Sequence, residues 1–321
     1  MFWALLVLAI GLVLLWKGAD LLVGGAVGLA ERMGVSQLVM GLTIVAMGTS
    51  APEVAASIAA AVSGKGDIAI GNVYGSNIAN LALVGGLVAL LRPLQVPAGT
   101  LRREIPAMLG VALLLWLPLH DLTTSRVDAL LLLLVFAVLV VYTVRTARAT
   151  RTNRPAEPSH VAAKPVRTLG RDILSMAFGL AALAGGARMA VYGAVAIGTR
   201  IGLSDAVIGS TIMAVGTSLP ELVTCVVAAV KGHHDISVGN LVGSNIFNTL
   251  LVVGAAGIIH PFTIGARFAG GPDYWIMIAV SAGFGMAAVL GRRTIGRIGG
   301  TVLLAAYAGY MVFLLSGTGP V

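Results

Sequence analysis

Hydrophobic residues fill ten long runs along this 321-residue chain, and polar residues gather in the stretches between them. Such runs are typical of α-helices that cross a bilayer, whose hydrocarbon core is roughly 30 Å thick. The ten predicted spans cover residues 2–30, 37–62, 71–91, 105–119, 127–145, 172–198, 206–230, 239–259, 273–290 and 298–316. The pattern therefore predicts an all-α polytopic membrane protein with ten transmembrane helices.

The composition agrees with a membrane protein. Hydrophobic residues make up 58% of the chain and charged residues only 11%, a balance that a water-soluble protein of this size does not need. The first run begins at Phe2 without a basic segment before it and continues past Lys17, so we interpret it as a retained helix and not as a cleaved signal peptide. The single cysteine, Cys225, excludes a disulfide framework and a thiol metal site.

Basic residues predict which side of the membrane each connection faces. The connection from Arg145 to Arg171 contains seven basic residues and one acid, so the positive-inside rule places it in the cytoplasm. With that side fixed, the inward connections hold 15 of the 21 Lys and Arg residues, and the outward connections hold 4. We expect a multi-pass protein of the cell (inner) membrane with both termini outside.

The connection in the middle of the chain divides it into two halves. Residues 146–171 include three prolines among Thr, Asn and Ser residues, which is typical of a flexible linker. We therefore expect a first five-helix repeat at residues 1–145, a cytoplasmic linker at 146–171 and a second five-helix repeat at 172–321.

The two halves share an internal duplication. Shifting the sequence by 168 positions aligns residues 39–80 with residues 207–248 without a gap, and 23 of the 42 positions are identical. The motif GTSAPE ending at Glu53 matches GTSLPE ending at Glu221. Because each half has an odd number of spans, the second copy enters the membrane inverted, a construction common among secondary transporters, which bind substrate near the midplane.

The duplicated acids predict a cation site. Glu53 lies about ten residues from the outer end of its span, or roughly 15 Å deep at 1.5 Å per residue, and the inverted copy places Glu221 at the same depth from the opposite face. A carboxylate at the bilayer centre costs about 2.5 to 3.5 kcal/mol on insertion scales, so two of them argue for a bound cation or proton. The remaining alternative is a pair of protonated acids that join helices.

Neighbouring residues supply further oxygen ligands. The glycine and proline of each motif predict a helix break, which frees carbonyl groups for an ion. Ca²⁺ prefers six to eight oxygens, which the two glutamates and nearby carbonyls provide, and hydroxyl groups suit Na⁺. Soft ligands that would favour zinc or copper are missing from this set. The predicted carbonyl ligands belong to Ala46, Thr49, Ala214 and Thr217, and the predicted hydroxyl ligands to Ser50, Ser76, Ser218 and Ser244.

GTSAPE and GTSLPE, each followed by GN-x-x-GSN-I-x-N, resemble the two alpha repeats of the calcium/cation antiporter superfamily, in particular bacterial calcium/sodium antiporters. The resemblance covers the whole ten-span chain. It implies that the first span of each half is a long, tilted helix that slides to alternate access. It also implies an ion-binding set of Thr49, Ser50, Glu53, Ser76 and Asn80 with Thr217, Ser218, Glu221, Ser244 and Asn248. Interhelical hydrogen bonding is the alternative role for the Ser and Asn residues.

Asn248 limits the charge of the site and therefore the ions that we expect it to bind. Several members of the superfamily, including potassium-dependent exchangers, carry aspartate there, whereas this chain has asparagine at both equivalent positions, Asn80 and Asn248. The site then carries two negative charges, which one Ca²⁺ balances and which Na⁺ balances only in pairs. We therefore expect exchange without potassium.

A second pair of charged residues occupies equivalent positions in the first span of each half. Asp20 and Arg188 align under the 168-residue shift, and we hypothesise that they pair across the pseudo-symmetry axis as a gate.

The leading functional hypothesis is secondary active antiport of Ca²⁺ against Na⁺ by alternating access. The nearest alternative is exchange of Ca²⁺ or another divalent cation for H⁺, since both glutamates titrate. A channel or a receptor is opposed by the inverted duplication, and an enzyme by the lack of a nucleotide loop, a nucleophile with a base, or a metal triad. We expect the lipid bilayer and the transported ions as partners, and no cofactor, nucleic acid or obligate protein partner.

Overall fold

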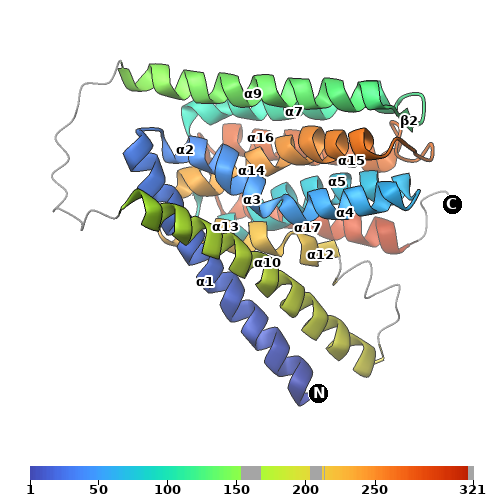
Figure 1. The fold of residues 1–321 in the computed structure, drawn as a ribbon, viewed down its shortest axis with the longest axis horizontal. Coiled ribbons are helices and arrows are strands. Elements are labelled where there is room, and N and C mark those ends of the chain that lie inside the picture. Colours follow the sequence, from blue (N-terminus) through green and yellow to red (C-terminus); the bar gives the residue numbers. More distant parts are fainter. Residues whose placement is uncertain (153–167, 203–211, 213, 317–321) are drawn as a thin grey trace.

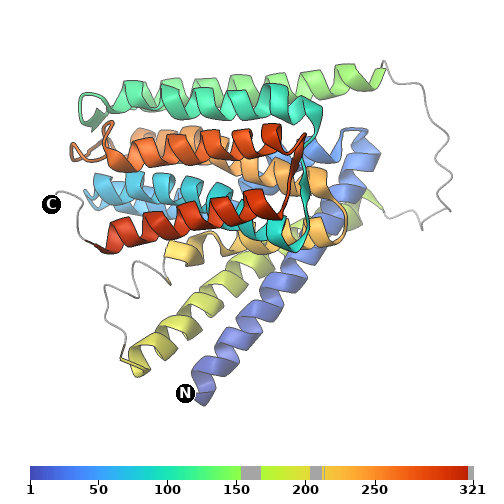
Figure 2. The same ribbon diagram turned by 180° about the vertical axis from the view of Figure 1, so that it is seen from behind.

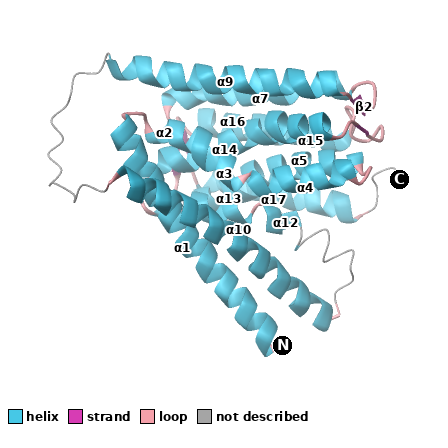
Figure 3. Ribbon diagram, viewed as in Figure 1, coloured by secondary structure: helices cyan, strands magenta, loops and turns pink. Residues whose placement is uncertain are grey.

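Long helices run from one end of the molecule to the other in the computed structural model, which describes residues 1–152, 168–202, 212 and 214–316 (Figure 1). Seven helices in this part of the chain are long and apolar enough to cross a membrane, and a bent pair of helices forms an eighth candidate span. The strands are two-residue pieces at the ends of the molecule, so the fold is helical throughout (Figure 3).

The first repeat contains the first five predicted spans, some of them built from several helical pieces. Its elements are α1 (Phe2–Met33), α2 (Gln37–Met40), η1 (Gly41–Val45), α3 (Ala46–Thr49), α4 (Ala51–Val62), α5 (Gly66–Ile78), η2 (Ala79–Val84), α6 (Gly85–Leu91), β1 (Leu94–Gln95), η3 (Thr100–Glu104), α7 (Ile105–Leu114), α8 (Trp116–Leu119), β2 (Thr123–Thr124) and α9 (Arg126–Thr152), where η denotes a π-helix.

The second repeat follows the same order. Its elements are α10 (Leu169–Arg200), α12 (Ala214–Thr217), α13 (Leu219–Val230), α14 (His234–Phe247), η5 (Asn248–Val252), α15 (Val253–Ile259), β3 (Phe262–Thr263), α16 (Pro272–Leu290), β4 (Thr294–Ile295) and α17 (Arg297–Leu315). Residues 206–211 and 213 of the predicted span at 206–230 lie outside the described residues. The expected linker at 146–171 is shorter than predicted at both ends, because α9 continues to Thr152 and α10 begins at Leu169; its middle lies outside the described residues.

Helices α1 and α10 lie side by side and cross the other helices obliquely (Figures 1 and 2). Glycines spaced seven residues apart form the contact between them, at positions 11, 18 and 25 of α1 and 179, 186 and 193 of α10. A methyl group at Gly18 would lie 2.8 Å from the Gly179 carbonyl oxygen, and one at Gly186 would lie 2.8 Å from the Gly11 carbonyl oxygen. The two backbones therefore touch directly, as small residues allow in membrane helices. We call this contact the glycine seam.

Short strand pairs join the repeats at both ends of the molecule. β1 pairs antiparallel with β4, and β2 pairs antiparallel with β3. Each pair takes one strand from each repeat, as the inverted arrangement requires. We call these ends the β1–β4 end and the β2–β3 end.

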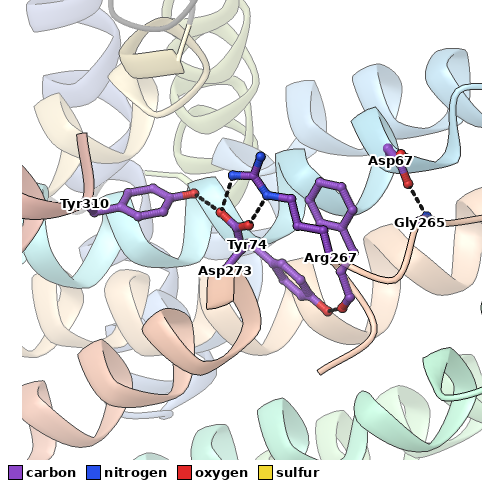
Figure 4. Close-up of polar contacts among 7 residues, drawn as sticks. Asp67, Tyr74, Gly265, Arg267, Asp273 and Tyr310 are labelled. Atoms are coloured by element: carbon purple, nitrogen blue, oxygen red, sulfur yellow. Dashed lines mark hydrogen bonds and ion pairs between the residues drawn. The ribbon is translucent and has the colours of Figure 1, made fainter. Parts of the chain in front are cut away.

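Polar contacts fasten the loop between β3 and α16 to the neighbouring helices (Figure 4). Arg267 Nε donates to Asp273 Oδ2 at 2.6 Å, and Tyr310 of α17 donates to the other carboxylate oxygen at 3.3 Å. The hydrogen bond between Arg267 and Asp273 raises the pKa of Arg267. Tyr74 of α5 donates to the Phe268 carbonyl at 2.8 Å, and the Gly265 amide donates to Asp67 at 2.6 Å. The loop thus ties α5 to α16 and α17.

Candidate cation site

Two helices are interrupted at equivalent points of the two repeats. The axis bends by 44° between Gln37–Thr49 and Ala51–Val62, with Ser50 at the break (φ −83°, ψ 4°). Ser218 has nearly the same conformation (φ −88°, ψ 5°) between α12 and α13. A proline follows in the first turn of α4 and of α13, where its missing N–H costs little.

These breaks set both glutamates at helix starts. Glu53 lies in the first turn of α4, and Glu221 lies in the first turn of α13. The amino-terminal end of a helix carries a partial positive charge, which stabilises a carboxylate there. The predicted breaks therefore also lower the cost of two buried charges.

The polar residues of the partner helices lie at or next to π-helical segments. Ser76 belongs to α5 and Asn80 to the following η2, while Ser244 belongs to α14 and Asn248 begins η5. Single π-turns within α-helices occur often at functional sites. η2 packs against α13, and η5 packs against α4. Each asparagine segment therefore contacts the helix that carries the carboxylate of the other repeat.

The carboxylates meet between the repeats. The Ser50 hydroxyl donates to Glu221 Oε1 at 3.2 Å. Ser50 directly precedes α4, whose first turn carries Glu53, so the Glu221 carboxylate lies beside the start of the helix that carries Glu53. Residues from both halves thus form one cluster, as the inverted repeat predicted.

The cluster is buried and poor in internal partners. Glu53, Glu221, Asn80 and Asn248 have no exposed surface, and neither carboxylate forms an ion pair within the described part of the chain. Side-chain atoms without a hydrogen-bond partner there are both oxygens of Glu53, Oε2 of Glu221, the hydroxyls of Ser218 and Ser244, and the amide groups of Asn80 and Asn248. A buried polar group without a partner costs about 1 to 3 kcal/mol, and a charged group costs more. Carboxylate, hydroxyl and amide oxygens are the ligands that hard cations prefer, so the donor set fits such an ion.

The predicted carbonyl ligands belong to helical residues, and the carbonyl of Ala46 already accepts hydrogen bonds. The Ala46 carbonyl accepts the Ser50 amide at 3.0 Å and the Thr49 hydroxyl at 3.3 Å. The helix therefore continues to Thr49, and the expected break is confined to Ser50. Ion binding by the Ala46 carbonyl stays a prediction. Ala214 and Thr217 are likewise helical, in α12, and the Ser218 amide bonds the carbonyl of Val215.

The model of the sodium/calcium exchanger protein family matches residues 3–145 and 172–316, almost the whole chain. The chain belongs to this family. The family consists of transporters and not of enzymes, and the ions are substrates and not cofactors.

Individual relatives of the exchanger match over nearly their full length. It is 41% identical over 309 residues to CaxA of Alkalimonas amylolytica, covering 96% of this chain and 97% of that protein. An inner membrane protein of Escherichia coli is 35% identical over 311 residues, with 96% and 95% coverage. A solved structure of a sodium/calcium exchanger from Methanococcus jannaschii superposes with a TM-score of 0.82 at 28% identity, covering 96% and 97%. The predicted ten-helix inverted-repeat membrane fold is therefore confirmed.

Sequence reasoning missed two asparagines that fasten the site helices of the exchanger. Asn72 donates to the Glu53 carbonyl at 3.2 Å and to the Ser57 hydroxyl at 2.9 Å, which ties α5 to α4. Its equivalent, Asn240, donates to Cys225 Sγ at 3.3 Å and accepts from the Thr49 hydroxyl at 3.1 Å. Both residues belong to the duplicated GN pair, so their presence in both copies was the available signal.

The exchanger does not pair Asp20 with Arg188. Asp20 forms an ion pair with Lys231, at the end of α13, and Arg188 is exposed. The reason is the antiparallel register of α1 and α10: Gly18 packs against Gly179, whereas Gly11 packs against Gly186. Asp20 therefore lies near the level of Gly179, nine residues or about 13 Å along α10 from Arg188. The hypothesis of an Asp20–Arg188 gate is wrong for this conformation.

Proposed function

We propose that this exchanger transports Ca²⁺ in one direction and Na⁺ in the other by alternating access, with both ions bound in turn at the buried cluster around Glu53 and Glu221. The observation that carries the proposal is the pair of buried carboxylates, one from each repeat, whose oxygens largely lack partners within the protein. The ligands of this set are Glu53, Glu221, Thr49, Thr217, Ser50, Ser218, Ser76, Ser244, Asn80 and Asn248.

The charge of the cluster favours Ca²⁺ and Na⁺ as alternatives. The two glutamates contribute two negative charges, and the asparagines at positions 80 and 248 contribute none. One Ca²⁺ or a pair of Na⁺ ions neutralises this charge. An unneutralised pair of carboxylates crossing a low-dielectric region is strongly disfavoured, so ions move by exchange. Without a third acid, the site gives no reason for a potassium requirement.

Helices α1 and α10 are suited to move as one body. The glycine seam joins them backbone to backbone, and a smaller apolar cluster, distinct from the main core, packs them against η1, α13 and α14. Side chains of α10 lie against the broken helices: Leu180 contacts Gly48, and Val191 contacts Gly216. A shift of this pair along its axis moves these two side chains past the site, which supports a role in access.

The orientation is part of the proposal. The connections at the β1–β4 end carry most of the basic residues, and by the positive-inside rule this supports a cytoplasmic β1–β4 end with both termini outside. The same reasoning assigns residues 1–145 and 172–321 to the two membrane repeats and residues 146–171 to a cytoplasmic linker.

The test is Ca²⁺ uptake into proteoliposomes that contain the purified exchanger. Vesicles loaded with Na⁺, vesicles with an imposed proton gradient and vesicles with no gradient are compared. We expect rapid uptake only with the outward sodium gradient. Uptake that follows the proton gradient and ignores Na⁺ would establish Ca²⁺/H⁺ exchange instead, and accumulation without a gradient would establish a channel. Replacing Na⁺ by K⁺ inside the vesicles should abolish uptake, and adding K⁺ outside should leave it unchanged.

A further inference from the structure

An apolar groove runs between α16 and α17, the last two helices of the chain. It has a volume of about 1290 Å³ and follows α17 from Arg297 to Phe313, about 24 Å at 1.5 Å per residue. Its walls include Val280, Gly283 and Ala287 of α16 with Val302, Ala306 and Gly309 of α17. A methyl group at Gly283 or at Gly309 would meet no atom within 4 Å, so both glycines face open space.

The two ends of the groove differ in charge. At the β2–β3 end, Tyr310 and Phe313 line it, and the Tyr310 hydroxyl is already bonded to Asp273 (Figure 4). At the β1–β4 end, Arg297 lines it, and Arg292 and Arg293 lie in the turn between the lining residues Gly291 and Thr294. All three arginines are exposed, and their side chains form no ion pair with any acid in the described ranges. The sequence contains no acid after Asp273.

We propose that this groove binds an anionic phospholipid, with an acyl chain along α16 and α17 and the phosphate against Arg297, Arg292 and Arg293. A guanidinium group matches the geometry of a phosphate with two parallel hydrogen bonds. Basic residues between membrane helices on the cytoplasmic side are a known basis for anionic lipid recognition. In the orientation proposed above, the arginine end faces the cytoplasmic leaflet, but lipid binding itself does not depend on the transport function.

A second copy of the chain fits this groove less well. Small residues do allow another helix to approach closely. However, a two-fold axis along the membrane normal brings the same surface of each copy together, so the arginine ends would meet. No acid of α16 after Asp273 or of α17 offsets that repulsion. A lipid supplies the missing negative charge, which a second copy does not.

Native mass spectrometry of the detergent-solubilised exchanger tests the proposal. Phosphatidylglycerol and phosphatidylcholine with identical acyl chains are added in separate titrations. The first variant, R292Q/R293Q/R297Q, removes the arginines and is matched by K65Q/R126Q/R200Q, which removes the same charge at the β2–β3 end. The second variant, G283L/G309L, fills the groove, and G110L is its control because Gly110 is also exposed and open but lies on α7.

We expect one phosphatidylglycerol to bind in clear preference to phosphatidylcholine. The arginine variant should lose this preference by roughly five-fold for each arginine, whereas its matched control keeps it. The groove variant should lose both lipids, and G110L should bind as the unmodified chain does. Equal binding of the two lipids by the unmodified chain, an unchanged preference in the arginine variant, or a dimer that G283L/G309L separates would overturn the proposal. If the groove variant unfolds, the headgroup preference of the unmodified chain and the result for the arginine variant still test the proposal.

Discussion

The two repeats have nearly the same sequence at the site but different local structure. Ser50 donates to Glu221, whereas the Ser218 hydroxyl and both oxygens of Glu53 have no partner in the described residues. The Ser50 amide bonds a carbonyl four residues back, and the Ser218 amide bonds one three residues back. The duplicated motif thus has two different hydrogen-bond arrangements in one molecule. The proposed alternating access requires such an asymmetry, because an opposite state would exchange the environments of the two repeats.

Removing either carboxylate should have the largest effect. Glu53→Gln and Glu221→Gln each leave one negative charge, too few to balance Ca²⁺, so we expect Na⁺-driven Ca²⁺ uptake to fall to that of protein-free vesicles. Glu31→Gln is the matched control, since Glu31 is an exposed acid at the end of α1. If only one of the two substitutions stops uptake, the repeats are not equivalent in function and the paired-site proposal fails.

The glycine seam gives the next largest effect and tests whether the repeats contribute equally to it. Gly18→Ala and Gly186→Ala, equivalent under the repeat, each place a methyl group 2.8 Å from backbone atoms of the other helix. We expect each to cost about 1 to 3 kcal/mol and to slow transport. Gly185→Ala, one residue away and facing open space, should change neither. Thermal unfolding in detergent and uptake rates provide the measurement, and equal behaviour of Gly185→Ala and Gly186→Ala would contradict the seam.

The serines at the helix breaks should separate the two repeats. Ser50→Ala removes a hydrogen bond to a charged group, whereas Ser218→Ala removes a hydroxyl that makes none in this conformation. We expect Ser50→Ala to weaken the apparent Ca²⁺ affinity by about tenfold and Ser218→Ala by less, when Ca²⁺ is supplied on one side of the membrane. Supplying Ca²⁺ on the other side should reverse the order. The same order from both sides would show that the asymmetry is not a property of one state.

Cys225→Ser should have the smallest effect, because it makes the second repeat resemble the first. Ser57, the equivalent residue, accepts from Asn72 and donates to the Ala69 carbonyl at 3.1 Å. A hydroxyl at position 225 can make the corresponding bonds to Asn240 and the Ser237 carbonyl. We expect changes in stability below about 0.5 kcal/mol and unchanged uptake. Thermal unfolding checks the first expectation, and a loss of transport would assign the thiol a role of its own.

Much of the fold followed from sequence because each decisive signal was local or repeated. Apolar runs located the spans, and a constant shift of 168 residues located Glu53 and Glu221 together with their serines and asparagines. The partner of Asp20 could not be predicted from the repeat. The shift aligns Asp20 with Arg188 in sequence, but the antiparallel packing of α1 and α10 separates them, and only the tertiary structure places Lys231 nearby.

The exact course of the helices was also hard to predict. The span expected at 105–119 begins earlier, as the π-helical η3 at Thr100, and continues as two separate helices, α7 and α8. Pro106 and Pro118 lie in this stretch, where each removes a backbone donor. The helix break expected around Ala46 is confined to Ser50, so the Ala46 carbonyl keeps a hydrogen bond to the Ser50 amide. Such details depend on packing between helices, which no local pattern records.

The strand pairs at the two ends have a mechanical consequence. Leu94 pairs with Ile295, and Thr123 pairs with Thr263, so main-chain bonds hold one repeat to the other at each end of the molecule. Because both ends are fastened in this way, the two repeats cannot separate by hinging about one end. In the part of the chain that the structure describes, no strand adjoins α1 or α10. The strand pairs therefore restrain the other helices of the two repeats more directly than they restrain α1 and α10.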